Sequence, residues 1–407
     1  MTLPLASTTR PLPGPLNPLD HYLHGGVAWL HDGAGLVGNG VAASVQVVLP
    51  DAVEAASLLL ASITVDDTVG VPGTGPVVFA AFPFDSSRPG ELVVPSTVVG
   101  CNPQGQAWMT TVGPASMKAS PPDSVESSQE PAVLSRFTLD GHSSRPRWIS
   151  MVCDALARIE NDEFAKVVVA RRVSVTADAD FDLVAVLGRL QRDHPTCFTF
   201  AVGDFLGASP ELLVRRRGAL VVSRPMAGTV ERGDTLDADQ RATEAMATSA
   251  KHGHEHRLVV DAVTEALRPW CQEVSASAQP EVARLATVAH LATTVAGRLR
   301  GEPPPSALAV VDRLHPTPAV AGWPREPALA AIAILEDFDR GRYAGPVGWM
   351  DSRGDGDWAV GIRGATIKGV TAEVVAGAGI VAGSDPAAEW VETQAKFDPM
   401  LRALVRV

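Results

Sequence analysis

Apolar and polar residues alternate in short, irregular blocks along most of this chain. Segments such as ASVQVVLP (43–50), PVVFAAFPF (76–84) and ELVVPSTVVG (91–100) are apolar and β-branched, and glycine or proline bounds them. They therefore predict strands. Beyond position 147, strand-like and helix-like runs follow one another without a regular period, which favours an α+β architecture over regular βαβ winding.

The chain divides at one stretch of unusual composition. Between positions 111 and 147 the sequence is rich in serine, proline and small polar residues, which is typical of a flexible loop. We therefore expect three parts. Residues 1–110 form a strand-rich N-terminal scaffold within the same domain, residues 111–147 form the loop, and residues 148–407 form the catalytic region.

Composition restricts the class of protein. With 46% apolar and 20% charged residues, the chain has the composition of a soluble globular protein. No apolar run reaches the roughly 18 residues that cross a bilayer, and the proline-rich N-terminus does not suit a signal peptide, so we expect a cytoplasmic protein. A net charge of -12 disfavours nucleic acid and anionic membranes as partners, because both attract basic surfaces.

The four cysteines, Cys101, Cys153, Cys197 and Cys271, are scattered and show no CxxC spacing. This distribution argues against a zinc site or a disulfide framework in a chain of this length. We interpret all four as buried thiols.

The run from Thr371 to Leu401 carries the strongest local pattern. It predicts an apolar strand, a glycine-rich turn (GAGIVAGSDP) and a helix on which Glu389, Glu392 and Lys396 fall at i, i+3 and i+7. One face of that helix would present two carboxylates and an ammonium, which suits a bound metal and an anionic ligand. An ordinary Glu–Lys pair on a solvated helix explains the same pattern.

The start of this helix has two candidate caps. Either Ser384 or Asp385 can cap it, and Pro386 suits its first turn. The glycine-rich turn would then bring free backbone N–H groups close to the charges, as helix N-termini do for anions.

Lys166 opens the β-branched segment FAKVVVARRVSV, in register with Val168 and Ala170, so the three side chains should share a face. Burial disfavours a charged amine and lowers its pKa by up to about 3 to 5 units. A buried Lys166 would thus be a usable base near neutral pH. The alternative is an edge lysine whose ammonium reaches water.

Glu211 follows Ser209 and Pro210 at the start of a hairpin strand, ahead of an apolar stretch. A carboxyl group in an apolar pocket has a raised pKa and can donate a proton to a leaving group. The alternative is a glutamate that faces solvent at the strand's entry. Beyond the hairpin, Gly228 allows close approach of backbone and ligand, with the Thr229 hydroxyl beside it.

The segment 239–270 has helical period, and Glu255 lies on its apolar face with Leu258 and Val259. A carboxylate on a buried face needs a cation, which is either Lys251 at i-4 or a hard metal ion. Together with the two glutamates of the C-terminal helix, it offers oxygen ligands without His or Cys. That set suits magnesium better than zinc.

Several segments follow, in order, the pattern of one protein family. They are KVVVAR, SPELLV, RPMAGT, SAKHGHEH, HLATTV, LHPTPAVAGWP, YAGPVGW, WAVGIRGATI and AGAGIVAGSDPAAEWVETQAK. Over about residues 150–402 the chain thereby resembles the chorismate-binding enzymes, and before that only in general character. The resemblance implies a single large α+β domain of two pseudo-symmetric halves, with layered antiparallel sheets and flanking helices. It also implies chorismate as the substrate and Mg2+ as the cofactor.

The family's functional residues can be carried over to the matching positions. The resemblance implies that Lys166 is the general base and Glu211 the general acid. It also implies that Glu255 and Glu392 bind the magnesium ion directly, with Glu389 close behind. The positions expected to contact substrate are Gly228, Thr229, His290, Ala319, Tyr343, Arg363, Gly377, Gly379 and Lys396.

Details of the motifs distinguish the members of this family. Ala227 stands where aminodeoxychorismate synthases have a lysine, and Lys166 stands where anthranilate synthases usually have a glutamine. Salicylate synthases share this lysine but commonly carry threonine at the position of Ala319. The chain is therefore most similar to isochorismate synthases, with salicylate synthase second and anthranilate synthase component I less favoured. His252 and Gly253 depart from the family, which usually has Asp or Asn and then Arg there.

The expected reaction follows from this resemblance. Water adds at C2 of chorismate while the C4 hydroxyl leaves, and a lysine suits water as nucleophile because water must lose a proton to attack. No redox cofactor is needed. The product would enter menaquinone or catecholate siderophore biosynthesis, and we expect a monomer because a domain of this size can be stable alone.

Overall fold

Strands dominate residues 4–115 and 136–405, the part of the chain that the computed structural model describes. They form one sheet of thirteen strands, one of nine and one of three. The thirteen-stranded sheet has the order β10 (Phe137–Gly141), β11 (Lys166–Ala177), β25 (Thr371–Val381), β24 (Gly364–Lys368), β13 (Phe205–Ser209), β12 (Phe198–Val202), β2 (Val27–His31), β3 (Ala34–Asn39), β8 (Thr97–Cys101), β9 (Ala107–Pro114), β1 (Leu5–Leu12) and β5 (Thr64–Asp67), with β21 (Gly322–Trp323) beside β11.

The other two sheets complete the framework. The nine-stranded sheet has the order β17 (Cys271–Ala276), β20 (Val295–Leu299), β15 (Leu220–Arg224), β14 (Leu212–Arg217), β23 (Gly356–Val360), β22 (Pro346–Asp351), β6 (Val77–Ala81), β7 (Pro89–Val94) and β4 (Ala43–Val48). The small sheet has the order β16 (Met226–Glu231), β19 (Val288–Ala292) and β18 (Glu281–Arg284).

The N-terminal strands are built into both large sheets. β2 pairs antiparallel with β12, and β6 pairs antiparallel with β22. Between the two sheets lies an aromatic core that includes Trp29, Phe79, Phe200 and Trp349. These side chains come from alternate positions of strands in both sheets, so the sheets pack face to face. The structure therefore confirms a single α+β domain with layered sheets, in which the described strand pairs are antiparallel except for β1–β5.

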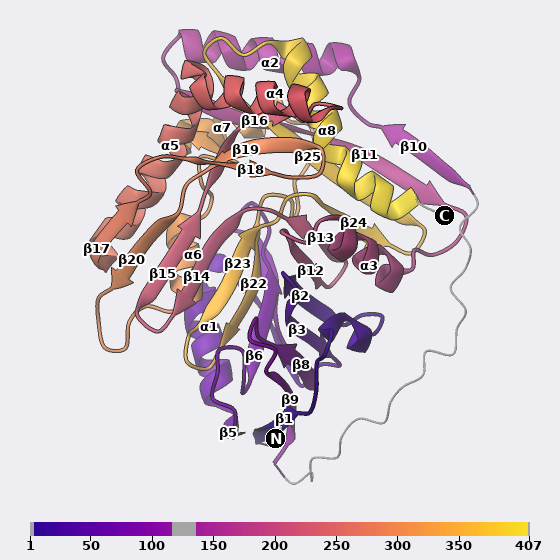
Figure 1. The fold of residues 1–407 in the computed structure, drawn as a ribbon, viewed down its shortest axis with the longest axis vertical. Helices are drawn as coiled ribbons and strands as arrows, with labels where there is room; N and C mark the ends of the chain where they lie inside the picture. Colours follow the sequence, from indigo (N-terminus) through magenta and orange to yellow (C-terminus); the bar gives the residue numbers. More distant parts are fainter. Residues whose placement is uncertain (1–3, 116–135, 406–407) are drawn as a thin grey trace.

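Helices pack against these sheets and against one another. They are α1 (Leu49–Ala61), α2 (Arg145–Glu160), α3 (Leu183–Asp193), α4 (Leu236–Thr248), α5 (Ala250–Leu267), α6 (Ala307–Leu314), α7 (Arg325–Leu335) and α8 (Pro386–Val405), with short 3-10 turns at Pro18–His21 and Arg268–Trp270. Figure 1 shows α2 and α4 at one end of the molecule and β1 and β5 at the other. α3 and α8 share an apolar core with β11, β24 and β25.

The loop predicted over 111–147 is shorter than expected, because regular structure occupies both of its ends. β9 continues to Pro114 by pairing with β1, β10 pairs with β11, and α2 begins at Arg145. β9 also pairs with the nearby β8, but β1, which extends β9 to Pro114, lies about a hundred residues earlier, and β10 is separated from β11 by the whole of α2. Local composition therefore carried no sign of these pairings. The middle of the predicted loop, 116–135, lies outside the described residues.

Two further predictions need correction. The helix predicted over 239–270 is two helices, because Ser249 adopts extended backbone (φ -71°, ψ 122°) and its side chain caps α5 through the His252 N–H. Cys153 is exposed, whereas the other three cysteines are buried. It lies off the face of α2 that buries Trp148, so helical geometry turns its thiol outward.

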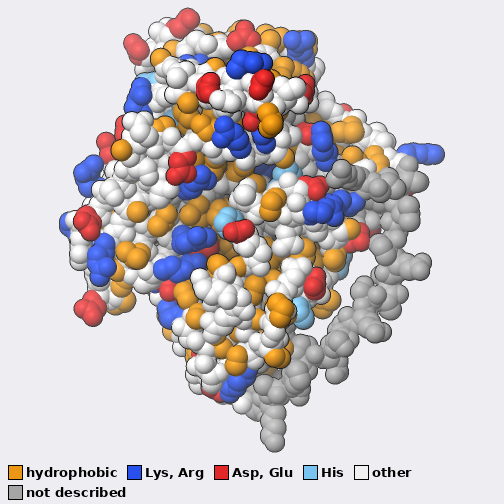
Figure 2. Space-filling model, viewed as in Figure 1, with side chains coloured by type: hydrophobic (Ala, Val, Ile, Leu, Met, Phe, Trp, Pro, Cys, Tyr) orange, Lys and Arg blue, Asp and Glu red, His pale blue; other side chains and the backbone are white. Residues whose placement is uncertain are grey.

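Charge is spread evenly over the visible surface. Figure 2 shows acidic and basic side chains interspersed over this face, without one large patch of either sign. Among the helices of the described residues, none has both the length and the hydropathy that a membrane span requires.

Candidate active site

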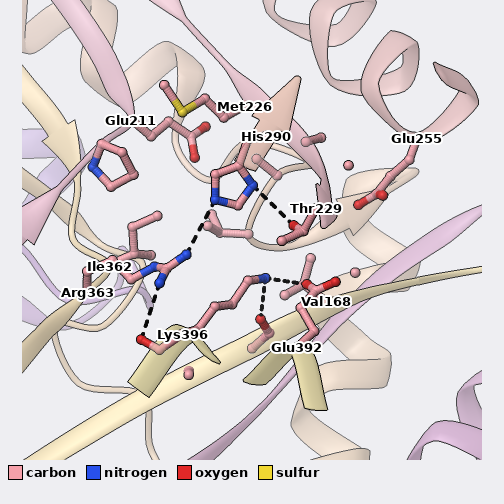
Figure 3. Close-up of a pocket in the computed structure, with 18 of the residues that line it drawn as sticks. Val168, Glu211, Met226, Thr229, Glu255, His290, Ile362, Arg363, Glu392 and Lys396 are labelled. Atoms are coloured by element: carbon pink, nitrogen blue, oxygen red, sulfur yellow. Dashed lines mark hydrogen bonds and ion pairs between the residues drawn. The ribbon is translucent and has the colours of Figure 1, made fainter. Parts of the chain in front are cut away.

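One cavity collects most of the residues that the sequence predicts to be functional. β11, β16, β19 and β25 meet α5 and α8 around it (Figure 3). The predicted residues that line it are Glu211, Gly228, Thr229, Glu255, His290, Ala319, Tyr343, Arg363, Gly377, Gly379, Glu392 and Lys396. Lys166 and Glu389 are not among the lining residues. Positions from distant parts of the chain thus converge on one site.

Lys166 lies behind the cavity wall, as the first residue of β11. Its side chain is 1% exposed, and its Nζ lies 3.0 Å from Oε1 of Glu255 on α5. Burial alone would raise the pKa of Glu255, but Lys166, Lys396 and His252 together outweigh burial, with the largest share from Lys166, and the pKa is lowered. The sequence-based prediction of a buried lysine is confirmed, but that lysine has a carboxylate partner. The cation that Glu255 needs is therefore Lys166 and not Lys251.

Gly377 and Gly379 lie within β25 and pair with β11, so the predicted turn is wrong over this part. A Cβ atom at Gly379 would lie 2.5 Å from Oε1 of Glu255, and one at Gly377 would lie 2.9 Å from Oη of Tyr343. Glycine in a strand often marks such a close approach. The glycines leave room for functional side chains, which local sequence could not distinguish from a turn.

The actual turn lies between Val381 and α8. Oδ1 of Asp385 accepts a hydrogen bond from the Ala388 N–H at 2.8 Å, which is the geometry of a helix cap. Oγ of Ser384 instead accepts from the Val381 N–H at 3.3 Å. Of the two candidate caps, Asp385 is therefore the one that is used.

Glu211 projects into the cavity from the residue before β14 (Figure 3). It is 4% exposed, which excludes the solvent-facing alternative. Burial raises its pKa to about 7, although the Met226 N–H and the nearby Lys166 and Lys396 ammonium groups oppose that rise. At neutral pH this carboxyl group can therefore hold a proton or release one.

We expect Glu211 to make stability depend on pH. A folded-state pKa of about 7, against 4.5 for the ordinary group, means that the folded protein binds this proton more tightly. Stability from this group is complete below pH 4.5 and is lost as pH rises through 7, by about 3 kcal/mol in total. Most of this loss, about 2.5 kcal/mol, falls between pH 5 and pH 8, so urea unfolding at these two pH values should show a decrease in wild type that is smaller by about 2.5 kcal/mol in Glu211→Gln. An equal decrease in both proteins would contradict the raised pKa.

His290 joins two other residues of the cavity in a hydrogen-bonded chain (Figure 3). Its Nδ1 lies 3.1 Å from Oγ1 of Thr229, and its Nε2 lies 3.3 Å from a guanidinium nitrogen of Arg363. Because a guanidinium can only donate, Nε2 is the acceptor and Nδ1–H donates to Thr229. Burial, with the charges of Arg363 and Lys396, holds the pKa of His290 well below its usual value. His290 is therefore a neutral imidazole of defined tautomer.

Arg363 and Tyr343 provide buried donors in the same wall. Arg363 has a left-handed backbone conformation, φ 54°, which is uncommon for a residue other than glycine. Its guanidinium donates to the Lys396 carbonyl at 3.4 Å. Burial raises the pKa of Tyr343 to about 12, so its phenol keeps the proton. A buried guanidinium and a buried phenol that line one cavity suit a carboxylate ligand.

The three glutamates predicted to hold a metal ion each pair with a different lysine. The pairs are Lys166–Glu255 at 3.0 Å, Lys396–Glu392 at 2.5 Å and Lys251–Glu389 at 3.1 Å. Only Glu255 and Glu392 line the cavity. Burial and the neighbouring Glu392 raise the pKa of Glu389, which lies outside the cavity.

The two glutamates that line the cavity fit a magnesium ion that also takes ligands from water and substrate. Within the described parts of the chain, no three His, Cys, Asp or Glu side chains gather as a complete metal site would. Two carboxylates from α5 and α8 nevertheless face one cavity that also offers carboxylate-binding donors. Magnesium uses one or two carboxylates and completes its shell with water and substrate. The donor set therefore suits Mg2+ bound together with an anionic ligand.

The apolar part of the cavity was not predicted. It includes Pro210, Met226, Val320, Ile362, Val375 and Ala376. Each of them is one or two positions from a predicted residue. Their closeness to the motifs was therefore the signal in the sequence that could have identified them. Apolar lining beside buried donors suits a ring with polar substituents at its edge.

Family comparison agrees with this geometry. The profile of the family described as "Chorismate binding enzyme" matches residues 31–405. The chain belongs to the chorismate-binding enzyme family. The match begins well before position 150, so the N-terminal strands from β3 onward belong to the matched family region and are not merely similar to it in character.

Individual relatives within the family are substantially similar. The chain is 40% identical to a Mycobacterium tuberculosis protein provisionally named isochorismate synthase MenF, over 82% of this chain and 87% of that protein. It is 37% identical to isochorismate synthase DhbC of Bacillus subtilis, over 81% of each chain. The structure of MenF, the menaquinone-specific isochorismate synthase of Escherichia coli, matches with a TM-score of 0.80 at 25% identity, covering 99% of this chain and 95% of that one.

Proposed function

We propose that this enzyme is an isochorismate synthase that converts chorismate to isochorismate with Mg2+ bound. The observation that carries the proposal is the cavity itself, which joins a carboxyl group with a pKa of about 7, Glu211, to the buried Lys166–Glu255 pair. The names of the relatives in the family support the same activity. Ala227 adds to this, because no amine is available there for a covalent lysine route.

Substrate binding would use the donors of one wall. The Arg363 guanidinium and the Tyr343 phenol would bind one carboxylate of chorismate, and the Lys396 ammonium would add its charge nearby. The neutral His290, fixed between Thr229 and Arg363, would face the ring without adding a positive charge. When bound, Mg2+ would neutralise the ring carboxylate and draw electron density from the ring.

Two side chains would move protons. Glu211 would protonate the departing C4 hydroxyl, a role that suits a carboxyl group with a pKa of about 7. Lys166 would accept a proton from the water that attacks C2. Oε1 of Glu255 would hold the Lys166 amine in place, and the second carboxylate oxygen of Glu255 could serve a metal ion.

Product analysis tests the proposal directly. Purified protein is incubated with chorismate and Mg2+, with and without ammonium, and the products are separated and identified. Isochorismate supports the proposal. Salicylate with pyruvate would make the enzyme a salicylate synthase, and anthranilate upon addition of ammonium would contradict both assignments.

The onward pathway is a separate question. MenF of Escherichia coli is menaquinone-specific by name, and we infer only that the product enters menaquinone or catecholate siderophore synthesis. Induction of the gene on iron limitation would favour the siderophore, and expression independent of iron would favour menaquinone.

We expect the two glutamates of α8 to differ in their effect on the metal requirement. Glu392 lines the cavity, whereas Glu389 does not. Glu392→Gln should raise the Mg2+ concentration for half-maximal rate by about 100-fold, and Glu389→Gln by no more than about 10-fold. Initial rates in Mg2+ titrations after treatment with EDTA measure both. Equal shifts, or activity that survives EDTA, would contradict the assignment of Glu392 as a ligand.

A further inference from the structure

One edge of β11 lacks a neighbouring strand close to the active site. β21 pairs only with Lys166 and Val167, and β10 begins to pair at Val173. Among the described residues, no strand pairs with positions 168–172 along this edge. The Val168 carbonyl and the Ala170 N–H nevertheless have partners, and these partners are side chains. Such buried backbone groups need partners because an unpaired one is costly.

The partners belong to a buried ion pair that the active-site motifs do not include. Arg340 and Glu336 are each 2% exposed, with 2.6 Å between their nearest charged atoms. Oε1 of Glu336 accepts from the Ala170 N–H at 2.8 Å. The Arg340 guanidinium donates to the Val168 carbonyl and to the Val320 carbonyl, both at 2.8 Å. The pair thus occupies the place of a missing strand and also reaches a second segment.

Each segment held by the pair contributes to the cavity. Val168 and Val320 both line it, as does Ala319 beside Val320. The Arg340 carbonyl also accepts a hydrogen bond from the Tyr343 N–H at 3.0 Å, and its guanidinium lies 5.9 Å from the Tyr343 ring centre. Arg340 therefore contacts three segments that line the cavity, those that carry Val168, Val320 and Tyr343.

The attraction between the two charges itself adds little to stability. A buried ion pair often contributes no more to folding than a well-packed apolar replacement, whereas loss of one partner alone costs about 3–5 kcal/mol. What a planar guanidinium does provide is a rigid set of donors in fixed directions. The guanidinium of Arg340 therefore fixes the distance between its two acceptors, the Val168 and Val320 carbonyls.

We propose that Arg340 and Glu336 are positioning residues, which hold the strand that carries Lys166 and the loop that carries Ala319 at the spacing that the reaction requires. They touch neither substrate nor metal and act through β11, the loop and Tyr343. The kinetic part of this proposal rests on the proposed function. Its structural part does not.

The test removes both charges together, so that neither remains buried alone. In Arg340→Met/Glu336→Gln, the glutamine can still accept from the Ala170 N–H, but the contacts to the Val168 and Val320 carbonyls are lost. We expect kcat to fall about 10- to 100-fold, because misplacement by about 1 Å can cost that much, and to fall by a larger factor than KM rises.

A second buried pair provides a matched control. Arg216 and Asp355 lie 3.0 Å apart, and the guanidinium likewise donates to two carbonyls, those of Arg353 and Pro304. Asp355 also accepts from a backbone N–H, that of Gly218. Neither member of this pair lines the cavity. Arg216→Met/Asp355→Asn should therefore lower the melting temperature by a similar amount and leave kcat close to that of wild type.

Hydrogen exchange separates this proposal from the proposed function. Amides of residues 164–171 and 316–323 should exchange about tenfold faster in the Arg340→Met/Glu336→Gln protein than in wild type, and the control should leave both segments unchanged. If wild type forms no isochorismate, the proposed function fails while this measurement still tests the positioning role. Unchanged exchange, or equal losses of kcat in the two double variants, would overturn the proposal.

Discussion

Replacing Lys166 with methionine is expected to lower the rate of isochorismate formation by about 10²- to 10⁴-fold, the usual contribution of a positioned acid or base. Methionine fills a similar volume but cannot accept a proton. Because the side chain is 1% exposed and pairs with Glu255, water cannot replace it readily. Single-turnover measurements with saturating chorismate and Mg2+ report the step itself.

The control for this variant is another lysine–glutamate pair. Lys251 pairs with Glu389 at 3.1 Å and does not line the cavity, so Lys251→Met should leave the rate within about tenfold of wild type. Because Lys166→Met leaves Glu255 buried without its cation, stability and chorismate binding are measured for both proteins. A Lys166→Met protein that is folded, binds chorismate and retains most of its rate would disprove the assignment of the base.

Replacing Glu211 with glutamine is expected to lower the rate by a similar factor, about 10²- to 10⁴-fold, and to change its dependence on pH. A general acid must be protonated, and the pKa of Glu211 is about 7. The wild-type rate should therefore be high below pH 7 and fall as pH rises above it. The residual rate of Glu211→Gln should lack this fall, because glutamine does not titrate.

Rates from pH 5.5 to 9 in both proteins measure this difference. Asp351→Asn serves as the control, since Asp351 is a buried carboxyl group whose pKa burial also raises and which does not line the cavity. It should keep the wild-type profile. A decline above pH 7 that persists in Glu211→Gln would assign the titration to another group.

Residues whose chemistry depends on burial alone could be predicted from the sequence. Glu211 precedes an apolar stretch, which left a buried acid and a solvent-facing glutamate as alternatives, and the structure selects the buried acid with its raised pKa. For Lys166 the pattern left a buried lysine and an edge lysine open, and the structure confirms the buried one. The other predicted residues that line the cavity were identified from the order of motifs along the chain. Their roles in the reaction remain predictions.

Features that depend on contacts between distant segments could not be predicted. The partner of Lys166 lies on α5, so no local pattern could show that the buried amine was paired. Gly379 resembled a turn residue. Nothing nearby in the sequence shows that Glu255 lies so close to it that a Cβ atom would not fit. Arg340 was missed for the same reason, since the backbone atoms that it contacts belong to β11 and to the loop before β21.

The interleaving of early and late strands has a consequence for how this protein is made. β6 forms its sheet by pairing with β22, which the ribosome synthesises only after most of the chain has emerged. At the usual speed of translation that delay is on the order of tens of seconds. Throughout it, the newly made apolar strands have open edges, so the nascent chain depends on chaperones or on slow post-translational closure to avoid self-association.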